Sequence, residues 1–417
     1  MDKLKILGKK RLSGSIKIPG AKNAALPIMI SSLLSENGLI IKNLPKLNDI
    51  STMKLLLKSF GIKITQSNYG EYFDSTNLSN KVADYELVRK MRASILVLGP
   101  LIARFKKAKI SLPGGCAIGT RPIDIHIKGL TKLGINFSIQ NGFVIGEAPS
   151  KLKGSNINLR FPSVGATENI MMAASLAEGQ TIINNAAREP EVIDLALCLN
   201  KMGAKIIGAG KKNIKIIGVK KLRKTNHKVI SDRIVAGTFV IAAVMLNNEF
   251  VVKNIDPDFL SVPLQILKKM GAKLEIGKNY IKVFKTKKII STSLETKPYP
   301  GFPTDLQAQI MALMSLAEGT SKIKEKIFEN RFMHVSELNR LGGNIKIKKD
   351  IAYVKGGQRF KGAQVMASDL RASVSLVLAG LCAEGQTTIN RVYHLDRGYE
   401  KIEETLGKCG LKISRFK

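Results

Sequence analysis

The sequence has no long hydrophobic run, and this absence argues against a protein built around membrane-spanning helices. Its longest apolar stretch, residues 234–246, is shorter than the roughly 20 residues that cross a bilayer. The first residues carry lysines, but no apolar segment follows them as in a secretory signal. Hydrophobic residues make up 44% of the chain, which permits large cores and argues against disorder. We therefore predict a cytoplasmic protein of two or three domains without membrane attachment.

Cysteine and histidine are scarce, with four residues of each. The histidines show no metal-ligand spacing. The cysteines lie far apart and form no Cys-X-X-Cys pair, which argues against a zinc site and against a disulfide framework. We expect no metal and no cofactor. The cysteines are Cys116, Cys198, Cys382 and Cys409.

Acidic residues are also few, with 32 Asp and Glu against 67 Lys and Arg, which gives a formal net charge of +35. Such an excess is found in nucleic-acid-binding proteins. Here the lysines are spread along the whole chain without interleaved aromatics or a basic tail, which favours an ordinary solvated surface. Both interpretations stay open at this point, and in either case the charge would attract anionic substrates.

The chain contains six copies of one unit, in which a helix, a glycine and a short strand recur about every 70 residues. A glycine at this place suits a left-handed residue that ends a helix. The closing glycines are Gly61, Gly134, Gly203, Gly271, Gly342 and Gly410.

Each copy also contains an earlier helix that is almost wholly apolar and must therefore be buried on every side. We predict an α/β protein of six βαβαββ-like units, grouped by three into two domains with buried central helices and sheets outside. The polar segment 221–227 suggests the boundary, and the site would lie between the halves. The apolar helices begin near Asn23, Arg92, Glu168, Arg233, Asp305 and Leu370.

The starts of these helices are polar, and several carry Lys or Arg. Asp, Thr and Ser have an ordinary role there as N-caps, but the helix dipole disfavours cations, unless an anion lies between them. Guanidinium groups bind carboxylate and phosphate bidentately, so we predict a small, multiply anionic substrate, although solvated charge stays an alternative. Four further arginines open the second helices: Arg121, Arg188, Arg331 and Arg397.

The glycine-rich segment 112–122, LPGGCAIGTRP, places Cys116 close to Arg121. Nearby guanidinium charge lowers the pKa of a thiol and raises its reactivity. We interpret the segment as a mobile loop with a reactive cysteine, with a small unreactive loop residue as the alternative.

Eight motifs along nearly the whole chain resemble the UDP-N-acetylglucosamine 1-carboxyvinyltransferases of the enolpyruvyl transferase family. The resemblance implies two inside-out α/β barrel domains of three repeats each, residues 21–229 with a cysteine lid loop at 112–122, and residues 1–20 plus 230–417. The motifs are GAKNAALPI (20–28), LPGGCAIGTRP (112–122), FPSVGATEN (161–169), NAAREPEVIDLA (185–196), FPTDLQAQ (302–309), FENRFMHVSEL (328–338), DLRASVSLVLAG (369–380) and HLDRGYE (394–400).

The implied activity is transfer of the enolpyruvyl group from phosphoenolpyruvate to the 3′-hydroxyl of UDP-N-acetylglucosamine. Phosphate leaves from a tetrahedral intermediate, in the first committed step of peptidoglycan synthesis. The implied partners are these two small molecules, with no specific nucleic acid, no membrane and no second subunit. The sister enzyme that acts on shikimate 3-phosphate shares the fold, but the cysteine loop and FPSVGATEN favour the UDP-sugar enzyme.

Matching positions also imply roles. Catalytic duty falls to Lys22, Cys116 as general acid or product-release residue, and Asp305 as general base. Lys22, Arg121 and Arg397 would hold the phosphate, Arg371 with Arg331 the carboxylate, and Asn23 would contact the reacting groups. The UDP-sugar site would be lined by Arg92, Arg121, Pro122, Ile123, Asp124, Ile125, Phe161, Pro162, Ser163, Val164, Asp305 and Ile327.

Overall fold

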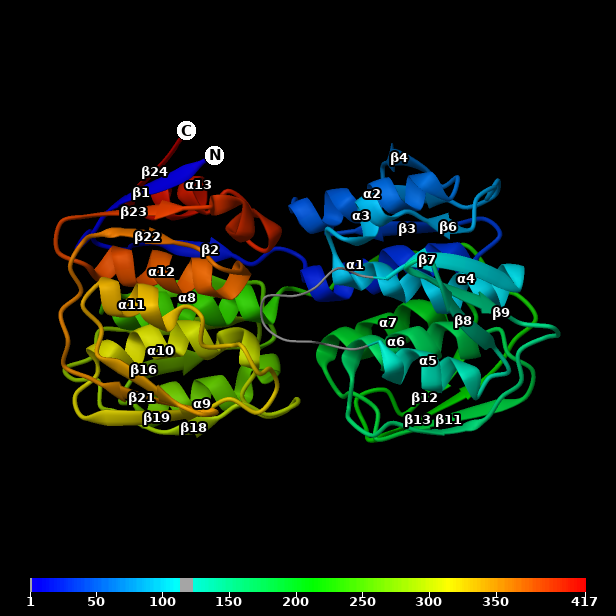
Figure 1. Cartoon of the computed structure of the whole chain (residues 1–417). Coiled ribbons are helices and arrows are strands. Elements are labelled where there is room, and N and C mark those ends of the chain that lie inside the picture. Colours follow the sequence, from blue (N-terminus) through cyan, green and yellow to red (C-terminus); the bar gives the residue numbers. More distant parts are fainter. Residues whose placement is uncertain (1, 113–122) are drawn as a thin grey trace. The chain divides into compact units, whose positions relative to one another are not determined.

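The computed structural model describes residues 2–112 and 123–417 (Figure 1). Contacts within the chain divide these residues into two compact units. The middle unit comprises residues 20–112 and 123–230, and the terminal unit comprises residues 2–19 and 231–417. Cys116, Arg121, Pro122 and most of the predicted lid loop lie outside the described residues, so the predictions made for them stay predictions.

The described residues of the middle unit form three four-stranded sheets with the orders β14-β3-β5-β4, β6-β7-β9-β8 and β10-β11-β13-β12. The first two strands of each order run parallel and the other neighbours antiparallel. The strands are β3 (Leu39–Lys42), β4 (Lys63–Ser67), β5 (Gly70–Asp74), β6 (Val82–Ala83), β7 (Lys107–Ser111), β8 (Asn136–Gln140), β9 (Phe143–Glu147), β10 (Asn156–Asn158), β11 (Gln180–Asn184), β12 (Lys205–Ile207), β13 (Asn213–Ile217) and β14 (Asn226–Lys228).

The terminal unit repeats this pattern in sheets of order β22-β23-β1-β24, β16-β17-β15-β2 and β18-β19-β21-β20. The parallel pairs are β22 with β23, β2 with β15, and β18 with β19. The strands are β1 (Lys3–Leu7), β2 (Ser15–Lys17), β15 (Phe250–Lys253), β16 (Lys273–Ile276), β17 (Tyr280–Phe284), β18 (Leu294–Glu295), β19 (Thr320–Lys324), β20 (Ile345–Lys348), β21 (Ile351–Lys355), β22 (Gln364–Met366), β23 (Gln386–Asn390) and β24 (Lys412–Phe416).

The helices alternate with these strands and complete the βαβαββ repeats, which confirms the predicted α/β class. In the middle unit they are α1 (Lys22–Ser31), η1 (Ser32–Leu34), α2 (Asn48–Ser59), α3 (Tyr85–Val88), η2 (Arg92–Val97), α4 (Leu98–Phe105), α5 (Asp124–Thr131), α6 (Val164–Ala174) and α7 (Pro190–Lys201). In the terminal unit they are α8 (Arg233–Met245), η3 (Pro257–Leu260), α9 (Ser261–Lys269), η4 (Thr304–Leu306), α10 (Gln307–Leu316), α11 (Val335–Arg340), α12 (Leu370–Cys382), η5 (Val392–Arg397) and α13 (Ile402–Gly407).

The central helices are buried, as their apolar sequences predict. Every residue of α8 is buried, and every residue of α12 except the last. Helices α8, α10 and α12 contact one another in the core of the terminal unit. Because apolar side chains surround each helix, contact with neighbours on all sides removes them from water, which is the main stabilising term of the fold.

The closing glycines confirm the repeat. All six have φ between 90° and 104°, a region that side chains with a Cβ rarely adopt. Each therefore ends its helix and redirects the chain into the following strand.

The polar segment 221–227, taken from the sequence as the domain boundary, belongs to the middle unit. Leu222 forms an isolated bridge with Ser35, and β14 pairs with β3. His227 is buried, and its Nε2 lies 2.8 Å from Asp194 Oδ1. The division between the units falls instead after Ile230. Within residues 2–112 and 123–417, no helix has both the length and the apolarity needed to cross a membrane.

Candidate functional site

Asp305 lies in η4, at the entrance to α10, and its carboxylate is held by two arginines. Arg331 Nη2 donates to Asp305 Oδ1 over 2.8 Å, and Arg371 Nη2 donates to Asp305 Oδ2 over 2.9 Å. Both arginines are buried, whereas the Asp305 side chain is 27% exposed. One partly accessible carboxylate therefore balances two buried cations, an arrangement that offsets their desolvation and leaves the acid within reach of a ligand.

Arg371 is placed by the start of α12. Asp369 caps this helix, and its Oδ1 accepts hydrogen bonds from the backbone N–H of Arg371 at 2.8 Å and of Ala372 at 3.2 Å. Burial lowers the pKa of Arg371, but Asp305, Tyr399 and Asp232 together outweigh burial and raise the pKa above its usual value. The guanidinium is therefore charged at every accessible pH.

Asp232 has the same capping role in α8, where its Oδ1 accepts from the N–H groups of Ile234 and Val235 at 2.9 and 3.0 Å. The ordinary N-cap interpretation is therefore correct for both aspartates. The arginine that follows Asp232, Arg233, is buried and lies over the ring of Tyr299, 5.4 Å from its centroid.

His334 lies behind Arg331, immediately before α11, and is fully buried. Burial lowers the pKa of His334 to about 4, an effect that Asp369 opposes and Arg331 reinforces. The imidazole is therefore neutral near pH 7 and adds no further positive charge beside Arg331. Its Nε2 has no hydrogen-bond partner within the described part of the chain.

The segments that contain Ile327 and Asp305 both donate hydrogen bonds to the carboxylate of Glu325. Glu325 Oε1 accepts from the backbone N–H of Ile327 at 2.8 Å, and its Oε2 accepts from Thr304 Oγ1 at 3.0 Å. Thr304 directly precedes Asp305. The predicted proximity of Ile327 to Asp305 thus has a physical basis in the buried Glu325 side chain.

Arg397, the last residue of η5, is half-buried. Burial and the charge of Arg397 together lower the pKa of His394. This electrostatic influence places Arg397 beside His394 in the terminal unit.

In the middle unit, Lys22 is the first residue of α1, and its Nζ lies 3.0 Å from Asp49 Oδ2 at the start of α2. Both side chains are buried, whereas Asn23 is exposed. A lysine at a helix N-terminus was interpreted as a sign of a bound anion, but the chain itself supplies a carboxylate. Sequence reasoning missed Asp49, and the polar Asn48-Asp49 pair that opens α2 was the signal available.

Two predicted UDP-sugar segments, residues 123–125 and 161–164, come together where α5 and α6 begin. Arg160 Nη2 lies 2.9 Å from Asp124 Oδ2, and α5 packs against α6. Ser163 caps α6, accepting a hydrogen bond from the N–H of Ala166 at 3.3 Å. Phe161 is 39% exposed, so its ring is available to a ligand instead of filling the core.

Arg92 opens η2, which packs against both α1 and α6. Its element therefore adjoins the element of Lys22 and that of Val164. Arg188, by contrast, uses its Nε to bind the backbone oxygen of Gly210 at 3.2 Å. This contact is structural and accounts for an arginine that the repeat pattern grouped with Arg331 and Arg397.

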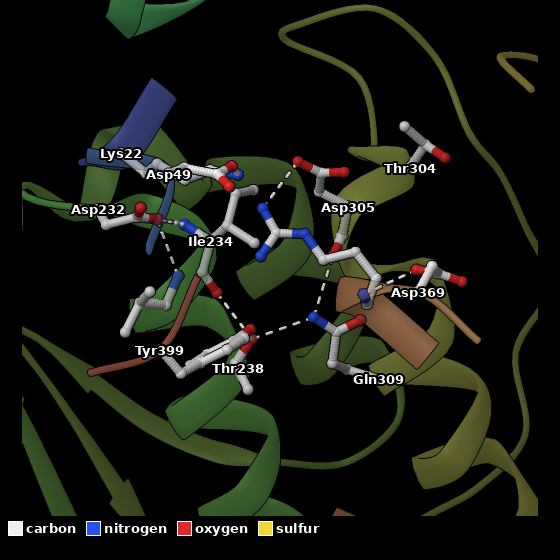
Figure 2. A network of polar contacts seen from close by, with 12 residues as sticks. Lys22, Asp49, Asp232, Ile234, Thr238, Thr304, Asp305, Gln309, Asp369 and Tyr399 are labelled. Atoms are coloured by element: carbon white, nitrogen blue, oxygen red, sulfur yellow. Dashed lines mark hydrogen bonds and ion pairs between the residues drawn. The ribbon is translucent and has the colours of Figure 1, made fainter. Parts of the chain in front are cut away.

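The structure thus gathers Asp305, Arg331 and Arg371 into one cluster of the terminal unit. Of the predicted UDP-sugar residues, Arg92, residues 123–125 and residues 161–164 lie at neighbouring helix starts of the middle unit, whereas Asp305 and Ile327 belong to the terminal unit. Sequence reasoning did not single out Thr238, Gln309 and Tyr399, which form a buried polar network behind Asp305 (Figure 2). A search of residues 2–112 and 123–417 finds no group of three or more His, Cys, Asp or Glu side chains suited to a metal ion.

Several proteins that resemble this chain along its full length are UDP-N-acetylglucosamine 1-carboxyvinyltransferases. A UDP-N-acetylglucosamine 1-carboxyvinyltransferase from Azorhizobium caulinodans is 50% identical over 427 residues, and that from Pelagibacter ubique is 50% identical over 416 residues. Both matches cover all of both chains. A UDP-N-acetylglucosamine 1-carboxyvinyltransferase 2 from Carboxydothermus hydrogenoformans is 52% identical, with 100% of this chain and 99% of the relative covered.

Solved structures share the fold at lower identity. The enolpyruvyl transferase NikO from Streptomyces tendae superposes with a TM-score of 0.91 at 23% identity, covering 99% of this chain and 98% of its own. An EPSP synthase from Acinetobacter baumannii gives a TM-score of 0.77 at 19% identity, with both chains covered completely. The sequence model of EPSP synthase (3-phosphoshikimate 1-carboxyvinyltransferase) matches residues 6–406. This match, together with relatives of about half identity along the full length, shows that the chain belongs to the EPSP synthase family of enolpyruvyl transferases.

Proposed function

We propose that this chain transfers the enolpyruvyl group of phosphoenolpyruvate to the 3′-hydroxyl of UDP-N-acetylglucosamine and releases phosphate, the first committed step of peptidoglycan synthesis. The observation that carries the proposal is the sequence identity of 50–52%, over the full length, to proteins named UDP-N-acetylglucosamine 1-carboxyvinyltransferase. The cluster of Asp305 with two arginines supports it, because a carboxylate beside fixed cations suits a reaction that moves a proton next to an anionic substrate.

In the reaction, Asp305 takes the proton of the sugar hydroxyl while the oxygen bonds to C2 of phosphoenolpyruvate. The electrons of the C2–C3 double bond take up a proton at C3, which gives a tetrahedral intermediate. The C2–O bond to phosphate then breaks, C3 loses a proton, and the double bond returns. Cys116 serves as the general acid at C3 or in product release.

The cations divide between the two anionic groups of phosphoenolpyruvate. Lys22, Arg121 and Arg397 hold the phosphate, and Arg371 with Arg331 holds the carboxylate. Fixed positive charges at these places stabilise the charge that shifts during addition and elimination. Asn23 contacts the reacting groups. The UDP-sugar is held by Arg92, residues 121–125, residues 161–164, Asp305 and Ile327.

A phosphate-release assay tests the function. Phosphoenolpyruvate is supplied with either UDP-N-acetylglucosamine or shikimate 3-phosphate, and we expect release only with the UDP-sugar. Turnover with shikimate 3-phosphate alone would assign the chain to the sister activity instead. The enzyme is further proposed to act as a cytoplasmic monomer of two domains, which sedimentation and cell fractionation test separately.

A further inference from the structure

A buried chain of hydrogen bonds lies behind Asp305 and Arg371, and the reaction described above gives it no role. It is formed by Thr238 of α8, Gln309 of α10 and Tyr399, which follows η5 (Figure 2). All three side chains are buried. Thr238 lies between the other two, with its Oγ1 2.8 Å from the Tyr399 hydroxyl and 3.1 Å from Gln309 Nε2.

The donors and acceptors of this network fix its direction. Thr238 has one hydroxyl proton, which it donates to the backbone oxygen of Ile234 over 2.8 Å. Its oxygen must therefore accept from both neighbours, so Tyr399 donates its proton to Thr238. The Tyr399 oxygen keeps its other lone pair, and the charge of the Arg371 guanidinium acts on this hydroxyl. Hydrogen bonds therefore connect Tyr399 to Thr238 of α8, and Tyr399 in turn interacts electrostatically with Arg371.

Gln309 connects the same network to the base. One Nε2 hydrogen goes to Thr238 Oγ1 and the other to the backbone oxygen of Asp305, at 3.1 and 2.9 Å. If the amide were flipped, Gln309 Oε1 would face the backbone oxygen of Asp305, and two acceptors cannot form a hydrogen bond. The orientation of the Gln309 amide is therefore determined. The consequence is that Gln309 Oε1 has no hydrogen-bond partner among the described residues. A buried orphan acceptor costs stability, and the two hydrogen bonds of Nε2 are what the Gln309 amide contributes in return.

We propose that Thr238, Gln309 and Tyr399 are positioning residues that keep Asp305 and Arg371 in the relative positions that enolpyruvyl transfer requires. This role rests on the function proposed above. Gln309 fixes the backbone of the base, Tyr399 presents its hydroxyl oxygen to the charge of the guanidinium that binds the substrate carboxylate, and Thr238 joins the two. Since a misplacement of about 1 Å costs on the order of 100-fold in rate, a rigid link between base and cation has a direct catalytic effect.

Substitution of Thr238 separates the hydroxyl from the shape of the side chain. We expect Thr238→Val to lower kcat about tenfold while leaving KM for the UDP-sugar within about twofold, because alignment and not binding is lost. Thr238→Ser keeps the hydroxyl and should restore kcat to nearly the wild-type value. Equal losses in the valine and serine variants would overturn the proposal.

Gln309→Met and Gln307→Met form a matched pair. Both glutamines lie on α10 and are fully buried, and within the described chain Gln307 has neither amide atom hydrogen-bonded. Methionine fills similar space without polar atoms, so we expect Gln307→Met to unfold at an unchanged or higher temperature. Gln309→Met leaves the acceptors on Thr238 and Asp305 unpaired and should unfold at a somewhat lower temperature. Only Gln309→Met should lose kcat. A Gln309→Met enzyme with full kcat, or an equal loss in Gln307→Met, contradicts the proposed role.

The wild-type assay keeps this test distinct from that of the proposed function. If the wild type transfers no enolpyruvyl group, the proposed function fails, and crystal structures of the wild type and Thr238→Val then test positioning directly. We expect the pair Arg371 Nη2 and Asp305 Oδ2, 2.9 Å apart here, to separate or shift in the variant. An unmoved pair would show that the network does not position these residues.

Discussion

Asp305 has two roles at the scale of the single residue, as the counterion of two buried arginines and as the proposed base. We predict that Asp305→Asn lowers turnover at least about 100-fold, because the amide cannot take a proton. Binding of the UDP-sugar, measured by calorimetry, should persist. The free energy of unfolding should also fall, because Arg331 and Arg371 lose the charge that balances them.

The control for this prediction is Glu384→Gln, which removes an exposed carboxylate paired with Lys9. Surface pairs contribute little, so activity and stability should both stay close to the wild type. Near-normal turnover in Asp305→Asn would exclude Asp305 as the base.

His334 gives a prediction about pH. In the unfolded chain a histidine titrates near pH 6.5, whereas the folded His334 stays neutral until about pH 4. Between these values the unfolded state binds the extra proton, so stability falls as the pH falls. We expect His334→Gln to remove about 2 kcal/mol of the difference in unfolding free energy between pH 7 and pH 5. Urea unfolding at both pH values measures it, and identical pH dependence in the variant and the wild type would contradict it.

At the scale of the element, α6 contains a carboxyl group whose surroundings disfavour its charged form. Glu168 is buried, and burial, followed by the charges of Glu191 and Glu189, raises its pKa well above the ordinary value. Its Oε1 has no hydrogen-bond partner among residues 2–112 and 123–417. Stability from this residue is present below the pKa of an unfolded glutamate and is lost as the pH rises toward the folded pKa.

We therefore predict that Glu168→Gln stabilises the protein at pH 8, because the unfolded state no longer gains from ionising this group. The increase in melting temperature should disappear near pH 4, where the wild-type residue is protonated in both states. Calorimetry at the two pH values measures the effect. An increase that is equal at both would assign it to packing and not to charge.

Elements with local signals were predictable from the sequence. The predicted helix starts at Arg233 and Leu370 are the observed starts of α8 and α12, because a buried helix must be apolar along its whole length. The start expected near Glu168 was late, since α6 begins at Val164. At Arg92 a 3-10 helix, η2, begins and precedes α4. The six closing glycines were found because positive φ restricts the choice of residue.

The contacts that build the site were not predictable from periodicity. Asp305 and Arg371 are 66 residues apart, and Thr238 and Gln309 are 71 apart, so only the folded chain shows which of them meet. Resemblance to the family named the charged residues, whereas the uncharged ones behind them were missed. Thr238 gave one weak signal, as the polar residue in the middle of an apolar helix.

At the scale of the whole molecule, the first strand of the chain belongs to the last sheet. Leu4 and Ile6 of β1 are fully buried, whereas Lys5 between them is exposed. We predict that Leu4→Ala with Ile6→Ala destabilises the terminal unit by about 2–5 kcal/mol for each substitution, because buried apolar volume is lost. Lys5→Ala is the matched control and should change little.

Amide hydrogen exchange would show which of the two units is destabilised by the Leu4 and Ile6 substitutions. If the units are separate domains, amides of residues 231–417 lose protection and those of residues 20–112 and 123–230 keep it. A uniform loss in both would show that the chain unfolds as one cooperative body.

The net charge of +35 gives a further prediction for the whole molecule. Many lysines lie on exposed sheet positions, among them Lys346 and Lys348 of β20. We expect any association with DNA to weaken steeply between about 50 and 200 mM salt and to show no sequence preference. Binding that discriminates between sequences would favour the nucleic-acid interpretation instead.

The pairing of β1 with β23 and β24 has a consequence for biosynthesis. The strand of residues 3–7 can pair with its two neighbours only after residues 386–390 and 412–416 have been synthesised. The middle unit is complete as soon as residue 230 has left the ribosome, and domains fold in the order of synthesis. During translation β1 therefore stays without these neighbours while the middle unit folds, and its sheet closes only after residues 412–416 have been made.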